Sequence, residues 1–353
     1  MSLVEDQLLR PAAETIPQDW EALARHLGGC GLSVGAAPPR QFAGGFGNLN
    51  YLIEIDGAPA VLRRPPHGPV PRGANDMGRE YRILSALWRV YPLAPRAFHY
   101  CADATVLGAP FQLIEYRPGI VVRDALPSAA GAAAGERLSR HLVECLAGLH
   151  AVSPQQAGLE TLGRPQGFLA RTLAGWSARG AALADLLEPR PWAETLAWLG
   201  GRVPAGGRAS LVHNDFKLDN VILDRASLAP VAVIDWDMGT QGDPLWDLAV
   251  LLSYWVEPGD PPCLHEMRQM PTAAPGFWSR GEAIDAYCRL SGRAIADFSF
   301  YRVLALLRSG IVFLQLYDRW RRDPAHNARS ARFATVGRDL LRCAHQATRG
   351  RAA

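Results

Sequence analysis

The chain has 353 residues, enough for one large domain or two smaller ones with cores of their own. Its 48% hydrophobic and 20% charged residues are typical of a globular protein, and a net charge of +3 is too small to indicate binding to nucleic acid or membranes. The N-terminal residues lack the apolar core of a signal peptide, and no uninterrupted apolar run approaches the length of a membrane span. Six scattered cysteines form no metal-binding pattern, so we expect reduced thiols and a cytoplasmic protein.

The first third of the chain predicts a β-rich region. A short helix over 19–27 ends at two glycines, and a second helix over 76–90 places Tyr81, Leu84, Leu87 and Trp88 on one face. Alternating apolar residues and the turn Asp56-Gly57 predict a hairpin. The expected strands cover 41–43, 51–55, 60–63, 97–101 and 111–116.

Beyond residue 119 the pattern is mainly helical, with a small β-hairpin inside it. Helices are expected over 136–151, 167–187, 191–202, 244–256, 278–290 and 298–320, and β-like segments over 211–212, 221–223 and 231–234. The basic tail after residue 320 either packs on this region or frays. The sequence thus predicts an α+β protein with a β-rich N-lobe (1–116) and a mainly helical C-lobe (117–353).

The strongest chemical signal is the octapeptide 213–220, which reads His-Asn-Asp-Phe-Lys-Leu-Asp-Asn. Phosphoryl transfer from ATP needs a carboxylate to accept the proton of the attacking hydroxyl, an oxygen ligand for Mg²⁺ and a cation near the γ-phosphoryl group. The octapeptide has the spacing of a kinase catalytic loop, in which Asp215 is the base and Asn220 a metal ligand.

Asp235 is the second metal-ligand candidate. The apolar segment 231–234 delivers this acidic residue fifteen positions after Asn220, where kinases place the Mg²⁺-chelating Asp of the DFG motif. Hard cations prefer oxygen ligands, so Asn220 and Asp235 suit Mg²⁺.

Lys217 is conspicuous because every other residue among the 37 Lys and Arg is arginine. It stands two positions after the candidate base, where a compact cation should contact the γ-phosphate. A point charge on a flexible stem fits a moving phosphoryl group better than a planar guanidinium does. The sequence therefore assigns Lys217 a catalytic role.

The three motifs together resemble the aminoglycoside phosphotransferase and choline kinase-like superfamily. They comprise 211–220, 232–237 and 242–248, in that order. The resemblance is closest to the phosphotransferase domains associated with acyl-CoA dehydrogenases and covers roughly residues 40–320. It implies a protein-kinase-like bilobal fold that uses ATP and Mg²⁺.

The same resemblance implies roles for residues outside these motifs. Arg63 takes the place of the third-strand lysine of kinases, and Glu80 is its ion-pair partner. Glu115 and Tyr116 form the hinge whose backbone meets adenine. Asp247 is a structural carboxylate that holds the catalytic loop through backbone hydrogen bonds. Arginine is larger than lysine and forks, so Arg63 is a variant of the family pattern.

A glycine-rich loop is expected to cover the phosphates, with Gly45, Gly47 and Asn48 as its binding residues. It reads Gly45-x-Gly47-x-x-Asn50 in place of GxGxxG and is a weak signal by itself.

The acceptor follows from charge. From residue 251 onward there are fifteen arginines against nine Asp and Glu, which suits an anionic hydroxy compound such as a hydroxyacyl-CoA better than a polycation. An aminoglycoside O-phosphotransferase and a non-catalytic nucleotide-binding protein remain as alternatives. A protein kinase is disfavoured because the space between Asp235 and Gly242 leaves no room for an activation loop. We expect a small-molecule acceptor, no nucleic acid or membrane partner, and a monomer or homodimer.

Overall fold

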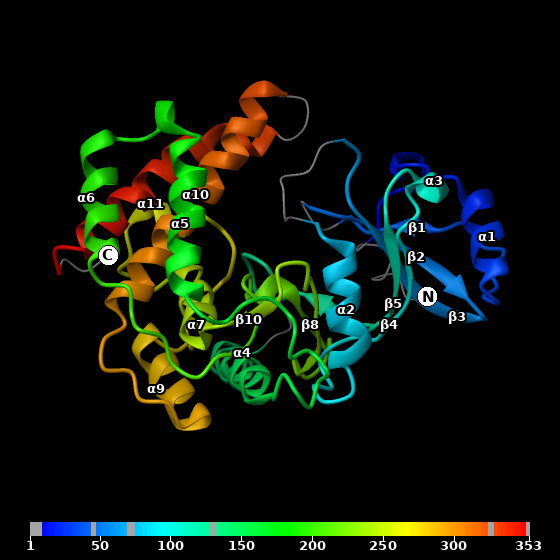
Figure 1. The fold of residues 1–353 in the computed structure, drawn as a ribbon, viewed down its shortest axis with the longest axis horizontal. Helices are drawn as coiled ribbons and strands as arrows, with labels where there is room; N and C mark the ends of the chain where they lie inside the picture. The colour runs from blue at the N-terminus through cyan, green and yellow to red at the C-terminus, as the bar shows by residue number, and fades with distance from the viewer. Residues whose placement is uncertain are drawn as a thin grey trace. The chain divides into compact units, whose positions relative to one another are not determined.

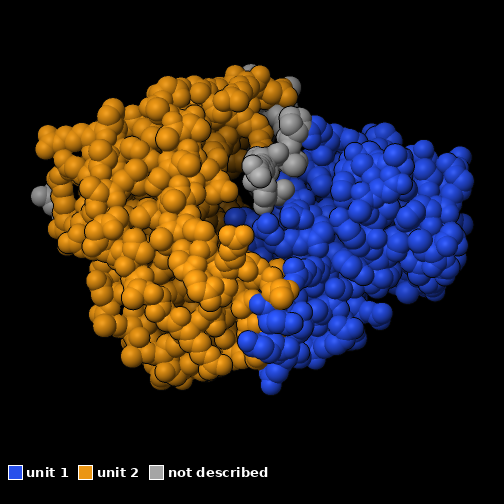
Figure 2. Space-filling view, in the orientation of Figure 1, with its two compact units in different colours: residues 1–119, 155–160, 231–239 blue, residues 120–154, 161–230, 240–353 orange. Residues whose placement is uncertain are grey.

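The computed structural model describes residues 9–43, 47–68, 75–127, 131, 133–323 and 328–350. The chain divides into two compact units (Figure 2). The first comprises residues 1–119 together with the segments 155–160 and 231–239, and the second comprises the remainder. The sequence places the boundary between residues 116 and 117, three residues before the end of the stretch 1–119. It does not assign the segments 155–160 and 231–239 to the first unit.

The first unit contains a five-stranded antiparallel sheet in the order β1-β2-β3-β5-β4 (Figure 1). Its strands are β1 (Arg40–Gln41), β2 (Leu49–Ile55), β3 (Ala58–Arg64), β4 (Ala97–Cys101) and β5 (Phe111–Glu115). The predicted hairpin is confirmed: Asp56 and Gly57 join β2 to β3, and both have positive φ angles of 50° and 78°. Two successive positive φ values are typical of the tight turns that match strand twist.

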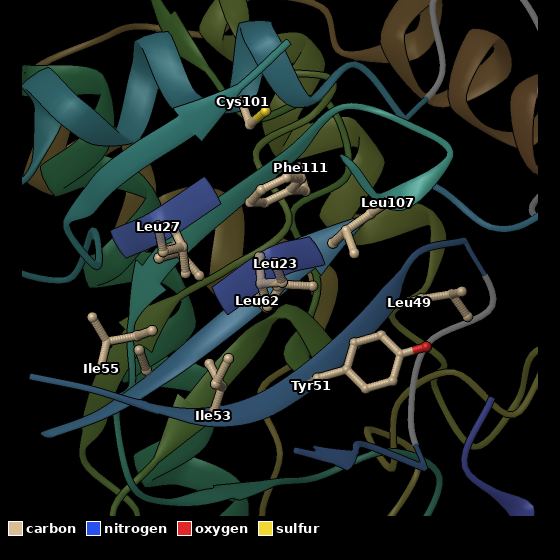
Figure 3. Packing of buried hydrophobic residues seen from close by; sticks show 12 residues of the cluster. Leu23, Leu27, Leu49, Tyr51, Ile53, Ile55, Leu62, Cys101, Leu107 and Phe111 are labelled. Carbon is tan, nitrogen blue, oxygen red and sulfur yellow. The ribbon is translucent and has the colours of Figure 1, made fainter. Parts of the chain in front are cut away.

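One face of this sheet is covered by α1 (Trp20–Gly29), which begins at the N-cap Asp19. Leu23 and Leu27 of this helix pack with Tyr51, Leu62 and other side chains in a buried apolar cluster (Figure 3). Successive side chains of a strand point to opposite faces. Because Leu62 faces this cluster, its neighbour Arg63 points to the other face of the sheet.

The helix predicted over 76–90 is α2 (Met77–Leu87), and Asp76 caps it by accepting a hydrogen bond from the Arg79 amide. The predicted apolar face was partly wrong. Tyr81 and Trp88 are only half-buried, whereas the buried residues are Met77, Glu80, Ile83, Leu84 and Leu87. A carboxylate thus occupies the centre of the buried face, which apolar periodicity alone does not predict.

The second unit is mainly helical, as predicted. Its helices of ten residues or more are α4 (Ala134–Ala151), α5 (Phe168–Ala181), α6 (Pro189–Gly200), α7 (Pro244–Ser253), α9 (Arg280–Ser291), α10 (Ser299–Arg322) and α11 (Phe333–Ala347). Short strands accompany them: β7 (Ser210–Val212) pairs with β10 (Thr240–Gly242), and β6 (Ile120–Val121) with β8 (Val221–Leu223). β9 (Pro230–Val233), whose last three residues belong to the first unit, forms where a strand was expected over 231–234.

The basic tail contains α11, which packs closely against α10. A methyl group added at Gly310 or at Gly337 would lie 2.9 Å from the carbonyl oxygen of the other glycine. Real Cβ atoms do not approach this closely, so glycines let the two helices meet. Of the two possibilities for the tail, packing therefore holds for the described residues 328–350.

Helix α10 is long and apolar enough to cross a membrane by length and composition alone. Arg302 and Arg308 interrupt its apolar run, and 72% of its most apolar window is buried inside the protein. These are the properties of a core helix of a globular unit.

Candidate active site

In the second unit, the backbone of the octapeptide 213–220 is held by Asp247 of α7. The carboxylate of Asp247 is fully buried and accepts hydrogen bonds from the amides of His213 at 2.5 Å and Asn214 at 2.6 Å. Asn214 has φ of 67°, a left-handed conformation that asparagine tolerates better than most residues. Asp247 thus has the structural role that the resemblance implied.

This backbone presents the carboxylate of Asp215 to the side chains of Arg308, Lys217 and Asn220. Its Oδ1 accepts from Arg308 Nη2 at 2.6 Å, and its Oδ2 lies 3.2 Å from Lys217 Nζ. Burial raises the pKa of Asp215, but the charges of Lys217 and Arg308 outweigh burial and hold it at about 2. Asp215 is therefore ionised at neutral pH, as a proton acceptor must be.

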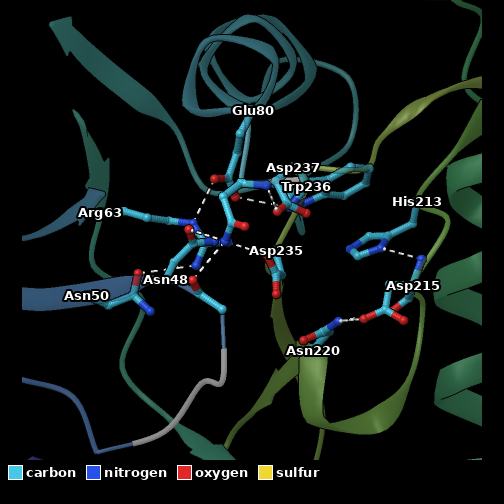
Figure 4. Close-up of polar contacts among 12 residues, drawn as sticks. Asn48, Asn50, Arg63, Glu80, His213, Asp215, Asn220, Asp235, Trp236 and Asp237 are labelled. Atoms are coloured by element: carbon cyan, nitrogen blue, oxygen red, sulfur yellow. Dashed lines mark hydrogen bonds and ion pairs between the residues drawn. The ribbon is translucent and has the colours of Figure 1, made fainter. Parts of the chain in front are cut away.

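Asn220 is oriented by the same loop. Its Nδ2 donates to the backbone oxygen of Asp215 at 2.9 Å and lies 3.4 Å from the carboxylate, so its amide oxygen is on the opposite side (Figure 4). A side-chain carbonyl oxygen is a ligand that Mg²⁺ prefers. Asn220 therefore fits the predicted metal-binding role.

Lys217 lies between two carboxylates and an aromatic ring. Its Nζ is 3.2 Å from Asp215, 3.5 Å from Asp219 and 5.3 Å from the centre of the Tyr254 ring. Burial opposes the charge, but Asp215 and Asp219 outweigh it and raise the pKa of Lys217. The single lysine of the chain is thus a permanent cation beside the candidate base.

Arg308 is a residue beside Asp215 that sequence reasoning missed. It lies on α10, is 3% exposed, and donates to Asp215 and, at 2.9 Å, to the Tyr254 hydroxyl. Burial opposes its charge, but Tyr254 and Asp215 raise its pKa. The only local signal was an arginine inside an apolar helical run.

The first unit contains the second group of predicted residues, centred on Arg63. Its Nε donates to Glu80 at 2.7 Å, its Nη1 to Asn50 at 3.2 Å and its Nη2 to Asp235 (Figure 4). The predicted Arg63–Glu80 pair is therefore present. A lysine has no planar fork and could not make all three contacts in this geometry.

Glu80 has three hydrogen-bond partners in this group. Besides Arg63, it accepts hydrogen bonds from Gln112 Nε2 at 2.8 Å and from the Trp236 amide at 3.0 Å. It thereby fixes the backbone just after Asp235. Gln112 belongs to no motif and was not predicted, and Asn50 appeared in the sequence only as the last position of the glycine-rich loop pattern, with no role assigned to its side chain.

Asp235 follows β9 with φ of 70°, a left-handed conformation that is uncommon outside glycine and clusters at functional sites. Asp237 lies close by, and burial and the negative charge of Asp235 raise the pKa of Asp237 to about 7. The three carboxylates of Glu80, Asp235 and Asp237 thus surround the single guanidinium of Arg63. This excess of negative charge and hard oxygen donors fits a divalent cation such as Mg²⁺.

The glycine-rich loop is described only from Gly47 onward, so the prediction for Gly45 lies outside the described residues. Asn75 Nδ2 donates at 2.8 Å both to the Gly47 carbonyl and to Asn48 Oδ1. The backbone amide of Asn75 also donates to the Asp237 carboxylate at 3.0 Å. Gly47 and Asn48 are thus linked through Asn75 to the carboxylate cluster.

The expected hinge residues end β5. The Glu115 amide donates to the Arg96 carbonyl at 2.8 Å, and its side chain pairs with Arg117 at 2.8 Å. Tyr116 stacks on Phe42 with ring centres 6.4 Å apart. The Glu115 side chain is therefore engaged within this unit, and a contact with adenine remains a prediction.

Solved structures of similar fold identify the architecture. The putative aminoglycoside phosphotransferase of Ralstonia eutropha JMP134 has a TM-score of 0.77 at 22% identity, with 95% of this chain and 99% of that one covered. A thermostable mutant of aminoglycoside phosphotransferase APH(4)-Ia, in ternary complex with ADP and hygromycin B, has a TM-score of 0.55 at 16% identity, with 91% and 97% covered. The fold is thus that of the kinase-like phosphotransferases, and the predicted fold class is confirmed.

The chain belongs to the phosphotransferase enzyme family, whose model matches residues 39–282. Acyl-CoA dehydrogenase family member 10 of Mus musculus is 31% identical over 312 residues, which cover 85% of this chain and 29% of the mouse protein. The chain thus spans less than a third of that relative's length. The resemblance that the sequence motifs indicated is confirmed.

Proposed function

We propose that this chain is an ATP- and Mg²⁺-dependent phosphotransferase that moves the γ-phosphoryl group to a hydroxyl of a small anionic molecule, such as a hydroxyacyl-CoA, in the cytoplasm. One observation carries the proposal. An ionised carboxylate, Asp215, is fixed beside a permanent cation, Lys217, and an oriented amide, Asn220. Base, cation and metal ligand are the parts that phosphoryl transfer requires.

The residues have distinct tasks in this reaction. Asp215 accepts the proton of the acceptor hydroxyl while that oxygen bonds to the γ-phosphorus and the bond to ADP breaks. Lys217 offsets negative charge on the phosphoryl oxygens. Asn220 and Asp235 hold Mg²⁺, which neutralises phosphate charge when bound.

Nucleotide use is supported by the ADP in the APH(4)-Ia complex. We infer that Arg63, kept in place by Glu80 and Asn50, contacts the phosphates where other kinases use lysine. We assign the phosphate cover to Gly45, Gly47 and Asn48, and adenine binding to the Glu115–Tyr116 backbone.

The acceptor class rests on charge and on the mouse relative, whose name refers to acyl-CoA. Some of the fifteen arginines beyond residue 250 are neutralised within the second unit, since Arg280 pairs with Glu257 at 2.9 Å and with Asp260 at 2.6 Å. The excess of positive charge nevertheless disfavours a polycation. An aminoglycoside acceptor is the second candidate, because a fold neighbour binds hygromycin B.

A panel assay of ADP release with ATP and Mg²⁺ tests the acceptor class. We expect turnover with hydroxyacyl-CoAs and little with kanamycin-type aminoglycosides. The reverse pattern would replace the acceptor proposal with the aminoglycoside alternative. An absence of transfer to every compound, with nucleotide binding intact, would favour the non-catalytic reading.

Replacing Arg308 with Met should lower kcat roughly 100-fold, because misplacing a catalytic group by about 1 Å costs that much. Arg308 contacts Asp215 but is not a predicted nucleotide ligand. We therefore expect nucleotide affinity to change less than twofold, and Arg308→Lys to recover part of the loss. Steady-state kinetics and calorimetry measure the two quantities, and the exposed Arg289→Met is the matched control. Equal losses in affinity and kcat would contradict this positioning role.

A further inference from the structure

Three side chains with metal-ligating atoms meet in the first unit, at the end of α1. His26 lies in the last turn of the helix, Cys30 is its C-cap residue, and His99 lies on β4. The two Nε2 atoms of the histidines are 3.2 Å apart, and the ligand atoms of all three residues lie within 4.8 Å of one another. Positions i and i+4 of a helix share one side, so His26 and Cys30 face His99 together.

These separations suit a tetrahedral metal. Zn–N bonds of about 2.0–2.1 Å and Zn–S bonds of about 2.3 Å place two nitrogens roughly 3.3 Å apart and nitrogen and sulfur roughly 3.6 Å apart. The histidine nitrogens already have this spacing. Cys30 is exposed at a helix end, so its thiolate has room to close the remaining gap.

A hydrogen bond between the imidazoles also explains the histidine spacing, but it gives the nearby thiol no role. The rings of His26 and His99 pack on Phe111, with centres 5.8 Å and 6.1 Å away, which limits their rotation. Their nitrogens are therefore held together before any ion binds.

We propose that His26, Cys30 and His99 bind one Zn²⁺ ion, with water as the fourth ligand. Two imidazoles and a thiolate select a borderline metal over Mg²⁺ or Ca²⁺, which prefer oxygen. The ion would tie α1 to β4. Phe111 and Cys101, beside the site, belong to the same apolar cluster as Leu62. The proposed Zn²⁺ site therefore lies on the α1 face of the sheet, and Arg63 points to the opposite face. The inference does not depend on the proposed phosphotransferase activity.

Metal titration of the full chain, stripped with a chelator, tests this site. We expect one Zn²⁺ per chain by competition with a chromophoric chelator, and a higher Tm with excess Zn²⁺. Co²⁺ in place of Zn²⁺ should give a thiolate-to-cobalt charge-transfer band. Cys30→Ser should abolish this band and weaken Zn²⁺ binding at least about tenfold, since even outer-shell changes cost 10–100-fold. Cys288→Ser, at a half-buried cysteine of the second unit, should change neither.

His26→Gln and His99→Gln should weaken Zn²⁺ binding in the same way. If the variant at the half-buried His99 fails to fold, Cys30→Ser still tests the proposed site, because an exposed thiol can be replaced without disturbing the fold. A wild-type chain that takes up no Zn²⁺ overturns the proposal. So does a cobalt complex that lacks the charge-transfer band, or Zn²⁺ binding that survives Cys30→Ser but is lost in Asp235→Asn.

Discussion

Asp215→Asn should lower kcat by roughly 10²–10⁴-fold, the contribution usual for a positioned general base, while nucleotide affinity stays within about twofold. An amide cannot accept the hydroxyl proton. The substitution also removes the anion that Lys217 and Arg308 share, so both cations lose their common partner. Steady-state kinetics with the best acceptor, together with calorimetry of a non-hydrolysable ATP analogue, separates catalysis from binding.

The matched control is Asp224→Asn, which changes an exposed carboxylate of the same unit that accepts hydrogen bonds only locally, from Ser227 and Ala226. It should leave both kcat and affinity unchanged. Turnover by Asp215→Asn at near wild-type rates would show that another group takes the proton.

Glu80→Met should lower the free energy of unfolding by about 3–5 kcal/mol, because it breaks a buried ion pair and removes part of the negative charge that compensates Arg63. The Arg63 and Glu80 side chains are 9% and 1% exposed. The variant also removes the acceptor for Gln112 Nε2 and the Trp236 amide. Denaturant unfolding monitored by fluorescence measures the loss.

An exposed pair provides the comparison for Glu80. Glu136 and Arg140 are 50% or more exposed and lie one helical turn apart. Glu136→Met should therefore cost less than about 0.5 kcal/mol. Equal stability changes in the two variants would mean that the Arg63–Glu80 pair contributes little to the first unit.

Sequence patterns predicted the parts of the fold and site that depend on residues close together in the chain. The Asp56-Gly57 turn requires positive φ at adjacent residues, and the composition of the turn indicates this directly. Asp215, Lys217 and Asn220 share one loop, so their spacing predicted their proximity. The Arg63–Glu80 pair is less local and was predicted only through the family resemblance.

The residues that were missed owe their role to tertiary contacts. Arg308 reaches Asp215 from a helix 93 positions further along the chain, and no periodicity connects the two. Glu80 occupies a buried helical position where an apolar residue is expected, because Arg63, Gln112 and the Trp236 amide satisfy its carboxylate. Partners of this kind become visible only in coordinates.

Calorimetric titration of a non-hydrolysable ATP analogue, with and without Mg²⁺, tests the central claim most directly. If Asn220 and Asp235 hold the metal on the nucleotide, the wild-type chain should bind the analogue with Mg²⁺ and at least about tenfold more weakly without it, since ligating carboxylates and their supports carry effects of this size. Asp235→Asn should remove most of this Mg²⁺ dependence. If the chain takes up no nucleotide in the presence of Mg²⁺, or binds it with an affinity that does not depend on Mg²⁺, the proposed metal-dependent nucleotide site is contradicted.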